Sequence, residues 1–161
     1  MLYRRYKPDE FEELYAIEEV CFQPPLRFGR GFMRRLVGNE SGATWVAEEN
    51  GCMAGFAIVE WTEEAGVPAA YIETIEVLPE MRGRGAGGEL LCRLENSARA
   101  AGARTIWLHV DESNRGAIRL YEAHGYRREC REDHYYGPRR AALVYAKALG
   151  DSRPRTEPAT A

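Results

Sequence analysis

Residues 82–88 form a glycine-rich segment whose composition suits the binding of a phosphate. Its sequence, Arg-Gly-Arg-Gly-Ala-Gly-Gly, lies between a strand-like run at residues 70–77 and a helix-like run at residues 89–99. Glycines let the backbone turn sharply and approach a ligand closely. The unpaired N–H groups in the first turn of a helix then point at that ligand, helped by the helix dipole. The segment therefore predicts a site for phosphate or pyrophosphate where the helix begins.

Four side chains near this segment have the chemistry to move protons. His109 lies near the end of a predicted strand at residues 105–110, and Tyr71 and Glu73 share one face of the preceding strand. Tyr121 lies on the next predicted helix. An imidazole titrates near neutral pH, and a carboxylate or a phenol can also exchange a proton with a substrate. Each residue has a structural alternative, because a packed histidine or tyrosine and a solvated carboxylate need no ligand.

The glycine segment can be compared with two common phosphate-binding patterns. The pattern G-x-x-x-x-G-K-[ST] is absent, because no Lys-Ser or Lys-Thr pair follows the glycines. Gly83, Gly85 and Gly88 do fit G-x-G-x-x-G, the fingerprint of dinucleotide-binding folds, and Asp111 lies near the position of its acidic residue. The order of the elements opposes that interpretation, since several strands precede the glycine turn instead of following it.

Three motifs, in order along the chain, resemble those of the GNAT superfamily of N-acetyltransferases. The segment R-x-x-G-x-G that starts at Arg82 resembles the loop that binds the pyrophosphate of acetyl-CoA. Residues 108–114, Leu-His-Val-Asp-Glu-Ser-Asn, resemble the fifth strand and its Ser-Asn turn, and residues 117–126 resemble the segment A-x-x-x-Y-x-x-x-G-[FY]. The resemblance covers residues 1–149, and it implies an acetyltransferase that uses acetyl-CoA (coenzyme A) as its cosubstrate.

The resemblance also implies roles for residues around the coenzyme. In this superfamily the two central strands diverge beside the acetyl group, and the N–H of Val77 would stabilise the oxyanion that forms there. The hydroxyl of Tyr121 would give a proton to the leaving thiolate as a general acid. The residues implied in coenzyme binding are Ile75, Val77, Arg82, Gly83, Arg84, Gly85, Ala86, Gly87, Gly88, Asn114 and Tyr121.

A second set of residues concerns the base that deprotonates the acceptor. Bacterial enzymes that acetylate the N-terminal alanine of a ribosomal protein resemble this chain, but they carry a glutamate at the position of His109. Eukaryotic NatE-type N-terminal acetyltransferases have a histidine there, paired with a tyrosine at the position of Tyr71. The resemblance therefore implies a catalytic pair of His109 and Tyr71, acting through an ordered water. Glu73 is the rival base, on the same face as Tyr71 by alternation.

The expected acceptor is the N-terminal α-amine of a protein or peptide, such as a ribosomal protein. An α-amine titrates near ~8 and a lysine near ~10.4, so lysine costs about 3.4 kcal/mol more to deprotonate at neutral pH. The resemblance implies that Tyr135 and Tyr136 cap a narrow slot, which admits a chain end more easily than an internal lysine. It also places Pro24, Pro25 and Leu26 in a stiff, apolar pocket, which favours an apolar or small first residue.

Two other functions remain open at this point. Within the same enzyme class, the acceptor is a protein lysine or a small amine such as a polyamine, which an acidic groove would favour. Outside that class, the chain is a non-catalytic acyl-CoA-binding regulatory module. Such a module would tolerate the loss of Tyr71, His109 and Tyr121, and the chain keeps a candidate at all three positions. A nucleotide-binding enzyme of another family ranks last.

The composition of the chain limits the kinds of partner and the cell compartment that we expect. The chain has 161 residues, the size of one domain, and its net charge of −3 shows no basic excess, so we expect no nucleic-acid partner. No apolar run reaches the length of a membrane span, and the first residues lack the apolar core of a signal peptide. Four cysteines without a C-x-x-C pair indicate free thiols in a reducing cytoplasm and no metal site. A monomer and a homodimer are both open.

The spacing of apolar residues, glycines and prolines predicts an α/β (α+β) fold with the order β-α-α-β-β-β-α-β-α-β-β. Strands are expected at residues 2–7, 44–49, 52–61, 71–77, 105–110, 126–133 and 140–147, and helices at residues 8–17, 32–37, 85–101 and 117–124. By resemblance this is one GNAT-fold domain at residues 1–149, with a mixed, mostly antiparallel sheet, splayed central strands and helices on both faces. The Pro-, Arg- and Thr-rich residues 150–161 are expected to be a disordered tail.

Overall fold

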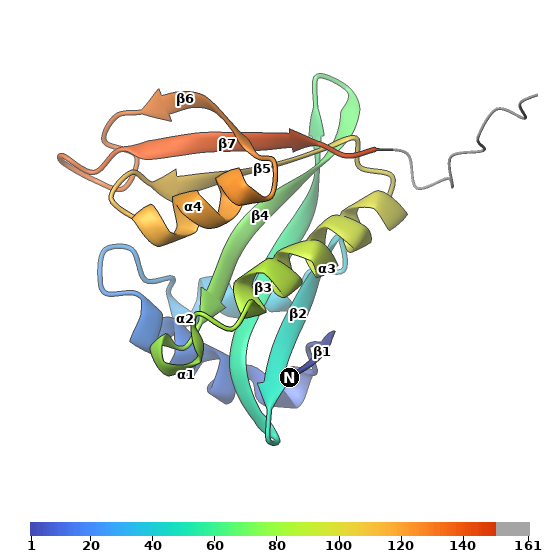
Figure 1. Ribbon diagram of the computed structural model, residues 1–161, viewed down its shortest axis with the longest axis vertical. Coiled ribbons are helices and arrows are strands. Elements are labelled where there is room, and N and C mark those ends of the chain that lie inside the picture. The colour runs from blue at the N-terminus through green and yellow to red at the C-terminus, as the bar shows by residue number, and fades with distance from the viewer. Residues whose placement is uncertain (151–161) are drawn as a thin grey trace, which may run out of the picture.

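Seven strands form one mixed sheet in the computed structural model, which describes residues 1–150 (Figure 1). Their order across the sheet is β1-β2-β3-β4-β5-β7-β6, and every neighbouring pair is antiparallel except β4 with β5. The strands are β1 (Leu2–Arg5), β2 (Gly42–Glu49), β3 (Cys52–Glu64), β4 (Val67–Val77), β5 (Thr105–Asp111), β6 (Arg127–Glu132) and β7 (Ala142–Ala148). The tail expected at residues 150–161 lies, except for Gly150, outside the described residues.

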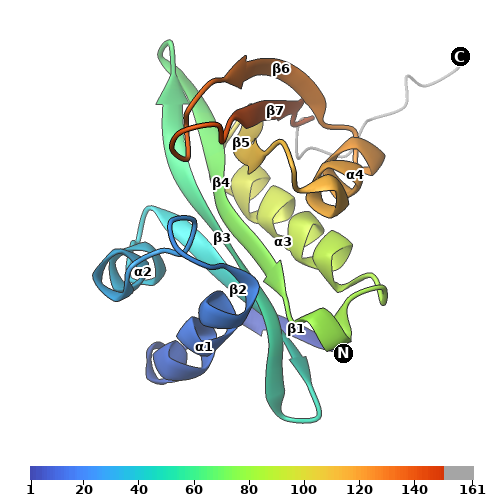
Figure 2. The ribbon, with the colours of Figure 1, turned by 90° about the vertical axis from the view of Figure 1, so that its left-hand side faces the viewer.

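Four α-helices cover the two faces of this sheet, with α1 and α2 on one face and α3 and α4 on the other (Figure 2). The helices are α1 (Phe11–Cys21), α2 (Arg30–Val37), α3 (Ala86–Ala100) and α4 (Arg115–Ala123), and two short 3-10 turns span Pro8–Glu10 and Pro79–Met81. None of the helices in residues 1–150 is long and apolar enough to cross a membrane. The mixed sheet with helices on both faces confirms the predicted fold class.

Each face of the sheet has its own apolar core. Leucines at helical spacing on α3 pack on one face, and apolar residues of α1 and α2 pack on the other, as amphipathic helices do. The α3 core includes Leu90, Leu91, Leu94, Ile106 and Leu108, and the α1–α2 core includes Leu14, Met33, Phe56 and Ile58. Three buried apolar residues of β4, Ala70, Ile72 and Val77, belong to the α3 core, so that core holds β4 in place.

The two central strands, β4 and β5, separate after a short parallel pairing. Residues 69–72 of β4 pair with residues 105–108 of β5, and no pairing continues beyond them in the described part of the chain. At the same point β4 contains a bulge against β3, where Glu73 is the extra residue between Ile72 and Thr74. A bulge bends and twists a strand locally, so β4 turns away while β5 stays paired with β7. The splay opens a gap beside the last residues of β4.

The hairpin of β3 and β4 is longer than the sequence predicts. Strand β3 continues to Glu64 and β4 begins at Val67, so residues 62–64 and 67–70 also belong to the sheet. The turn uses Ala65 and Gly66 in left-handed conformations, with φ of 51° and 80°. This end of the hairpin projects beyond the core, and its residues are mostly exposed. They therefore lack the alternation of apolar and polar residues by which a half-buried strand is recognised.

Candidate active site

The glycine-rich segment forms a turn whose shape requires two of its glycines. Gly83 and Gly85 have φ of 79° and 83°, in the left-handed region that other residues rarely adopt. Gly85 is the N-cap of α3, and its carbonyl accepts the first helical hydrogen bond from Glu89 N–H at 3.1 Å. The N–H groups at the start of the helix therefore have no partner within the helix, and they can bind an anion. We call residues 83–88 the phosphate cradle.

Two further glycines allow α4 to lie against the start of α3. A Cβ at Gly88 would lie 3.1 Å from Nε2 of His124, and a Cβ at Gly87 would lie 3.4 Å from Leu120. The His124 ring has a fixed position, because its Nδ1 lies 2.8 Å from the carbonyl oxygen of Leu120. Larger residues at these positions would push α4 away from the phosphate cradle. The glycines thus shape the cradle and also bring its neighbouring helix close.

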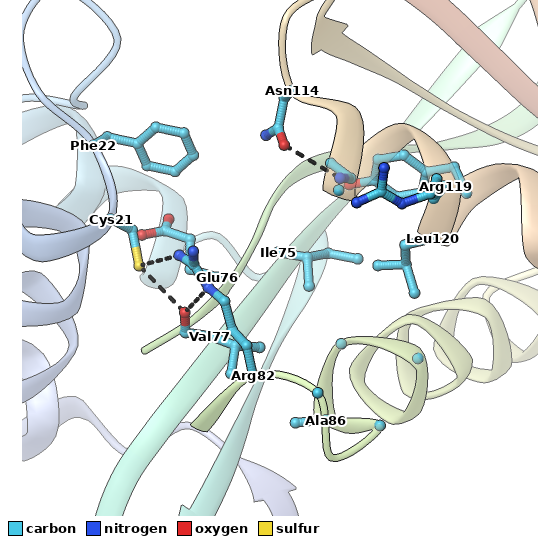
Figure 3. A pocket seen from close by; sticks show the side chains of 17 residues that line it. Cys21, Phe22, Ile75, Glu76, Val77, Arg82, Ala86, Asn114, Arg119 and Leu120 are labelled. Atoms are coloured by element: carbon cyan, nitrogen blue, oxygen red, sulfur yellow. Dashed lines mark hydrogen bonds between the residues drawn. The ribbon is translucent and has the colours of Figure 1, made fainter. Parts of the chain in front are cut away.

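A cavity of about 680 Å³ opens beside the phosphate cradle and runs along the end of β4 toward α4 (Figure 3). Ile75 and Val77 line it from the part of β4 beyond the splay, and Leu120 and Tyr121 line it from α4. Asn114, the N-cap of α4, also lines it, and its Oδ1 accepts a hydrogen bond from Ala117 N–H at 3.2 Å. The cavity has the size of a ligand site, with anion-binding groups at one end and apolar walls at the other.

The two arginines of the glycine segment have different positions. The Arg82 Nε–H donates to the carbonyl of Val77 at 2.9 Å, and its Nη2 lies 3.7 Å from the sulfur of Cys21. Arg82 therefore fastens the turn to the end of β4, as Figure 3 shows. Arg84 is exposed and pairs with Glu49 of β2 at 3.8 Å, and it does not line the larger cavity.

Cys21 is the one cysteine among the described residues that lines the larger cavity. Its thiol donates to the carbonyl of Val77 at 3.6 Å. Burial, followed by the charge of Glu76, raises the pKa of Cys21 to about 11. The sulfur is therefore a neutral thiol at physiological pH, and a neutral thiol is a poor nucleophile.

A smaller cavity of about 100 Å³ lies on the other side of the splay. Phe22, Leu26 and Phe28, from the loop between α1 and α2, line one side of it. The groups that line its other side include Glu73, Thr74, His109, Asp111 and Tyr136. The lining is therefore mixed, whereas the sequence predicts an apolar pocket. Pro24 and Pro25 belong to the same loop but do not line the cavity.

The structure brings Tyr71 and His109 into direct contact. The Tyr71 hydroxyl lies 2.8 Å from Nδ1 of His109, across the parallel pairing of β4 and β5. Burial, followed by the neighbouring Tyr135, raises the pKa of Tyr71 well above its usual range, so its phenol stays neutral. A neutral phenol donates to an unprotonated imidazole nitrogen, which places the ring proton of neutral His109 on Nε2. The pair predicted from the sequence is therefore a hydrogen-bonded unit in the structure.

Two residues of the C-terminal hairpin hold the other side of the His109 ring. Tyr135 stacks on it, with ring centroids 4.1 Å apart and planes 7° from parallel. Glu132 of β6 places an oxygen 3.3 Å from Nε2, within ion-pair range but without hydrogen-bond alignment. A carboxylate at that distance stabilises a positive charge on the ring. The ring of His109 is thus held between Tyr135, Glu132 and the Tyr71 hydroxyl.

Glu73, the rival base, lies close to a second carboxyl group. Burial, followed by Glu60 of β3, raises the pKa of Glu73 to about 8. At pH 7 only about a tenth of this group is then ionised. A carboxyl group that is mostly protonated is able to accept a proton in only a minority of molecules at neutral pH, which counts against Glu73 as the base.

Tyr121 lines both cavities and lies where they meet. Burial raises the pKa of its phenol well above the usual range, so it is a proton donor at neutral pH. Tyr136 also has a raised pKa because of burial, and its loop is tied to β5 by an ion pair of Arg140 with Asp111 at 3.1 Å. The two predicted slot tyrosines thus differ, because Tyr136 faces the smaller cavity while Tyr135 covers His109.

Several residues near the site are absent from the sequence-based prediction. These residues are Glu132, Glu60 and Phe28, and no local motif marks them. Glu132 lies 23 positions from His109 and Glu60 lies 13 positions from Glu73. Glu132 precedes Tyr135 by three residues in the last hairpin. The alternation of side chains between the two faces of this strand is the sequence signal that could have identified Glu132. Its distance from His109 depends on the register between β6, β7 and β5.

The sequence model of the acetyltransferase (GNAT) family matches residues 5–126. The chain is 32% identical over 144 residues to [ribosomal protein bS18]-alanine N-acetyltransferase of Haemophilus influenzae, covering 85% of this chain and 91% of that protein. It is also 32% identical over 112 residues to the uncharacterized N-acetyltransferase YhfO of Bacillus subtilis, covering 68% and 75%.

Solved structures share the fold at lower identity. The ribosomal-protein-S18-alanine N-acetyltransferase of Escherichia coli has a TM-score of 0.81 at 24% identity, covering 97% of both chains. Arabidopsis thaliana NAA60 in complex with a bisubstrate analogue has a TM-score of 0.81 at 21% identity, covering 94% of this chain and 99% of that one. These similarities show that the sheet and the helices have the same overall arrangement.

Proposed function

This chain belongs to the acetyltransferase (GNAT) family, and we propose that it transfers the acetyl group of acetyl-CoA to the N-terminal α-amine of a protein or peptide. It is an N-acetyltransferase, with acetyl-CoA as its acyl donor. The observation that carries the choice of acceptor is the Tyr71–His109 hydrogen bond beside a cavity of only about 100 Å³. The identity to an enzyme for the N-terminal alanine of ribosomal protein bS18 supports the same choice.

The residues around the larger cavity fit acetyl-CoA. The phosphate cradle offers backbone N–H groups for the pyrophosphate, and the end of β4 offers unpaired backbone groups for the extended arm. The N–H of Val77 is placed to stabilise an oxyanion, and Tyr121 stands where the two cavities meet. When bound, acetyl-CoA supplies an activated acyl group to the junction of the cavities.

The proton of the acceptor amine passes to the pair of Tyr71 and His109. Tyr71 does not line the smaller cavity, so its oxygen accepts the proton of the amine through a water, while its own proton moves to Nδ1 of His109. The imidazolium that forms is stabilised by Glu132, and Tyr135 keeps the ring in its plane. No protein group needs to become a charged phenolate, which burial disfavours.

The smaller cavity favours a first residue with a small side chain. Its volume is only about 100 Å³, and four of the side chains that line it are large: Phe22, Leu26, Phe28 and Tyr136. Glu73 and Thr74 make one side of the cavity polar. The side chain of an alanine, serine or threonine can lie against this side without a large loss of free energy from desolvation. We therefore expect peptides that begin with alanine or serine to be better acceptors than peptides that begin with methionine and leucine.

A peptide panel tests this function directly. Thiol release from acetyl-CoA would be measured at pH 7.5 with peptides that begin with Ala, Ser, Met-Ala or Met-Leu, an N-blocked lysine peptide and spermidine. We expect release with free N-termini, strongest for Ala and Ser, and release at least about tenfold slower with the blocked peptide, given the higher pKa of lysine. Faster release with the blocked peptide or with spermidine would contradict an α-amine acceptor.

One observation favours a second candidate acceptor, a cationic lysine or small amine. Glu73, Glu60 and Asp111 bring three carboxyl groups to the acceptor side of the splay. A carboxylate there would attract an ammonium group. The raised pKa of Glu73 weakens this attraction at neutral pH, which is why the α-amine ranks first. The lysine peptide and spermidine in the panel decide between the two acceptors.

The general-acid role of Tyr121 leads to a separate prediction. We expect Tyr121→Phe to lower kcat by about 10²-fold, the usual range for loss of a general acid, with the KM for acetyl-CoA changed less than about threefold. Tyr126→Phe is the matched control, because Tyr126 lies 5.6 Å from the Tyr121 ring but its hydroxyl bonds Glu95, away from both cavities. Equal losses of kcat in the two variants would show that Tyr121 only packs.

A further inference from the structure

Two carboxyl groups that the proposed chemistry does not use are buried together between α1 and β4. Glu18 of α1 is 0% exposed and Glu76 of β4 is 2% exposed. One oxygen of each is satisfied, since Phe28 N–H donates to Glu18 Oε1 at 2.7 Å and the Thr74 hydroxyl donates to Glu76 Oε2 at 2.8 Å. The remaining oxygens, Glu18 Oε2 and Glu76 Oε1, receive no hydrogen bond from any other group in residues 1–150. After burial, Glu18 is the group that most strongly affects the Glu76 carboxyl, so the two carboxyl groups are neighbours between α1 and β4.

Electrostatics favours one proton on this pair. Two buried carboxylates in contact repel each other and lose their hydration, whereas a carboxylic acid can donate to a carboxylate and satisfy both free oxygens. Burial, followed by Glu18, raises the pKa of Glu76 well above its usual range.

Few other charges face the pair. In the described residues these are Arg82, from the turn after β4, and the thiol of Cys21 at the end of α1. Strand β3 presents the apolar Phe56 directly opposite Glu76, and α2 contributes the apolar Met33 to the same core. The guanidinium of Arg82 is already bound to the carbonyl of Val77, and the thiol of Cys21 is neutral at physiological pH. Protonation of the pair is therefore the main way to remove its repulsion.

The pair lies where the acceptor side of the site is fastened to the coenzyme side. Phe28, whose N–H is bound by Glu18, ends the loop of residues 22–28 that lines the smaller cavity, and we call this segment the acceptor loop. Glu76 lines the larger cavity and precedes Val77 (Figure 3). A second hydrogen bond also holds Phe28, because the Tyr15 hydroxyl donates to the Phe28 carbonyl at 2.8 Å.

We propose that Glu18 and Glu76 share a single proton, and that the resulting hydrogen bond between acid and carboxylate positions the acceptor loop against β4. The acceptor role of the loop rests on the proposed function, but the shared proton does not. A carboxyl whose pKa is raised by folding contributes stability that is fully present below its unfolded pKa of about 4.3 and is lost as the pH rises through the folded pKa. The positioning contact therefore weakens as the pH rises through the folded pKa of Glu76.

Glu76→Gln tests the shared proton by thermal unfolding. The amide of Gln can donate to Glu18 and accept from Thr74 at every pH, so the variant keeps the contact and loses its titration. We expect the Tm of the wild type to fall relative to the variant by roughly 5–10 °C between pH 5 and pH 9, and Glu18→Gln to behave in the same way. Parallel Tm curves for wild type and Glu76→Gln would overturn the proposal.

Glu95→Gln is the matched control for burial alone. Glu95 is 4% exposed but is paired with Lys147 at 2.9 Å and with Arg99 at 3.5 Å. Its charge is therefore compensated, and removing the charge should lower the Tm at neutral pH instead of raising it. If the Tm of Glu95→Gln also rose relative to the wild type at alkaline pH, the difference between wild type and Glu76→Gln would result from burial of a carboxyl group and not from a shared proton. That result would overturn the proposal.

The acceptor loop supplies a readout that a purely structural pair would not change. We expect the acceptor KM of the wild type to rise by about fivefold more than that of Glu76→Gln as the pH rises through the folded pKa of the pair. Trypsin cleavage after Arg27, inside the loop, should accelerate over the same range in the wild type relative to the variant. If KM and cleavage follow the same pH profile in both proteins, the pair does not position the loop.

Carbon-13 NMR of glutamate carboxyl groups separates this proposal from the proposed function. In the wild type at pH 7 we expect one pair of carboxyl resonances with a protonated component that is lost in Glu76→Gln. Absence of any protonated carboxyl attributable to Glu18 or Glu76 would overturn the shared proton. A protein that transfers no acetyl group but shows this resonance would count against the proposed function and leave the shared proton established.

Discussion

Replacing His109 with alanine is expected to lower kcat with an alanine-starting peptide by about 10³-fold at pH 7, within the range for loss of a general base. The variant also removes the hydrogen bond from Tyr71 at 2.8 Å, so the phenol no longer has a group to which it can pass its proton. The KM for acetyl-CoA should change by less than about threefold, because His109 does not line the larger cavity. Steady-state kinetics with varied acetyl-CoA and varied peptide separate the two effects.

The pH dependence of the same variant distinguishes a base from a packing residue. An α-amine titrates near ~8, so at pH 9 most of the acceptor is neutral without help from the protein. The factor by which kcat of His109→Ala falls below that of the wild type should therefore decrease by about tenfold between pH 7 and pH 9. If this factor stayed constant over the same pH range, His109 would support the structure of the site and would not accept the proton.

Glu73→Gln is the matched variant for the rival base. Glu73 lines the same cavity as His109, but its raised pKa of about 8 keeps it mostly protonated at pH 7. Gln resembles the protonated carboxyl in size and polarity, so the substitution should cost less than about tenfold in kcat at pH 7. A loss as large as that of His109→Ala would assign the base to Glu73.

The parts of the site that the sequence predicts are those built from neighbouring residues. The phosphate cradle needs only a strand, glycines and a helix start, and all of its determinants lie within residues 77–88. Tyr71 and His109 come from strands whose ends are marked by these motifs. The parallel pairing sets Tyr71 opposite Trp107, and His109 follows on the same face of β5, within reach of Tyr71. Local sequence therefore identifies the cradle, the two central strands and the residues at their ends.

The parts that the sequence does not predict depend on contacts between distant elements. Glu18 approaches Glu76 across 58 positions, and Glu132 approaches His109 only through the register of the last hairpin. The bulge at Glu73 interrupts the strict alternation from which face assignments are made along β4. In a sequence pattern, a glutamate is interpreted as a solvated surface residue, so periodicity does not predict a buried pair of carboxyl groups.

Replacing Gly85 with valine is expected to raise the KM for acetyl-CoA by about 10- to 100-fold, equivalent to ~1.4–2.8 kcal/mol. Gly85 has a φ of 83° at the N-cap of α3, a conformation in which a β-branched residue is strained. A change of φ there would turn the N–H groups of the phosphate cradle away from the anion. Each hydrogen bond to a charged group contributes about 1.5–3 kcal/mol, so the loss of one or two accounts for the effect.

Gly66→Val is the matched control for this prediction. Gly66 has nearly the same conformation, with a φ of 80°, and a Cβ at either glycine would have no heavy atom within 4 Å. The two variants should therefore show similar decreases in Tm, because the backbone strain is similar. Gly66 lies in the β3–β4 turn and does not line the larger cavity, so its KM for acetyl-CoA should stay within about twofold of the wild type. The difference in KM between the variants then measures what the backbone conformation at Gly85 contributes to coenzyme binding. If both variants raised KM equally, the weaker binding would come from lower stability of the fold, and the phosphate cradle would not be the anion site.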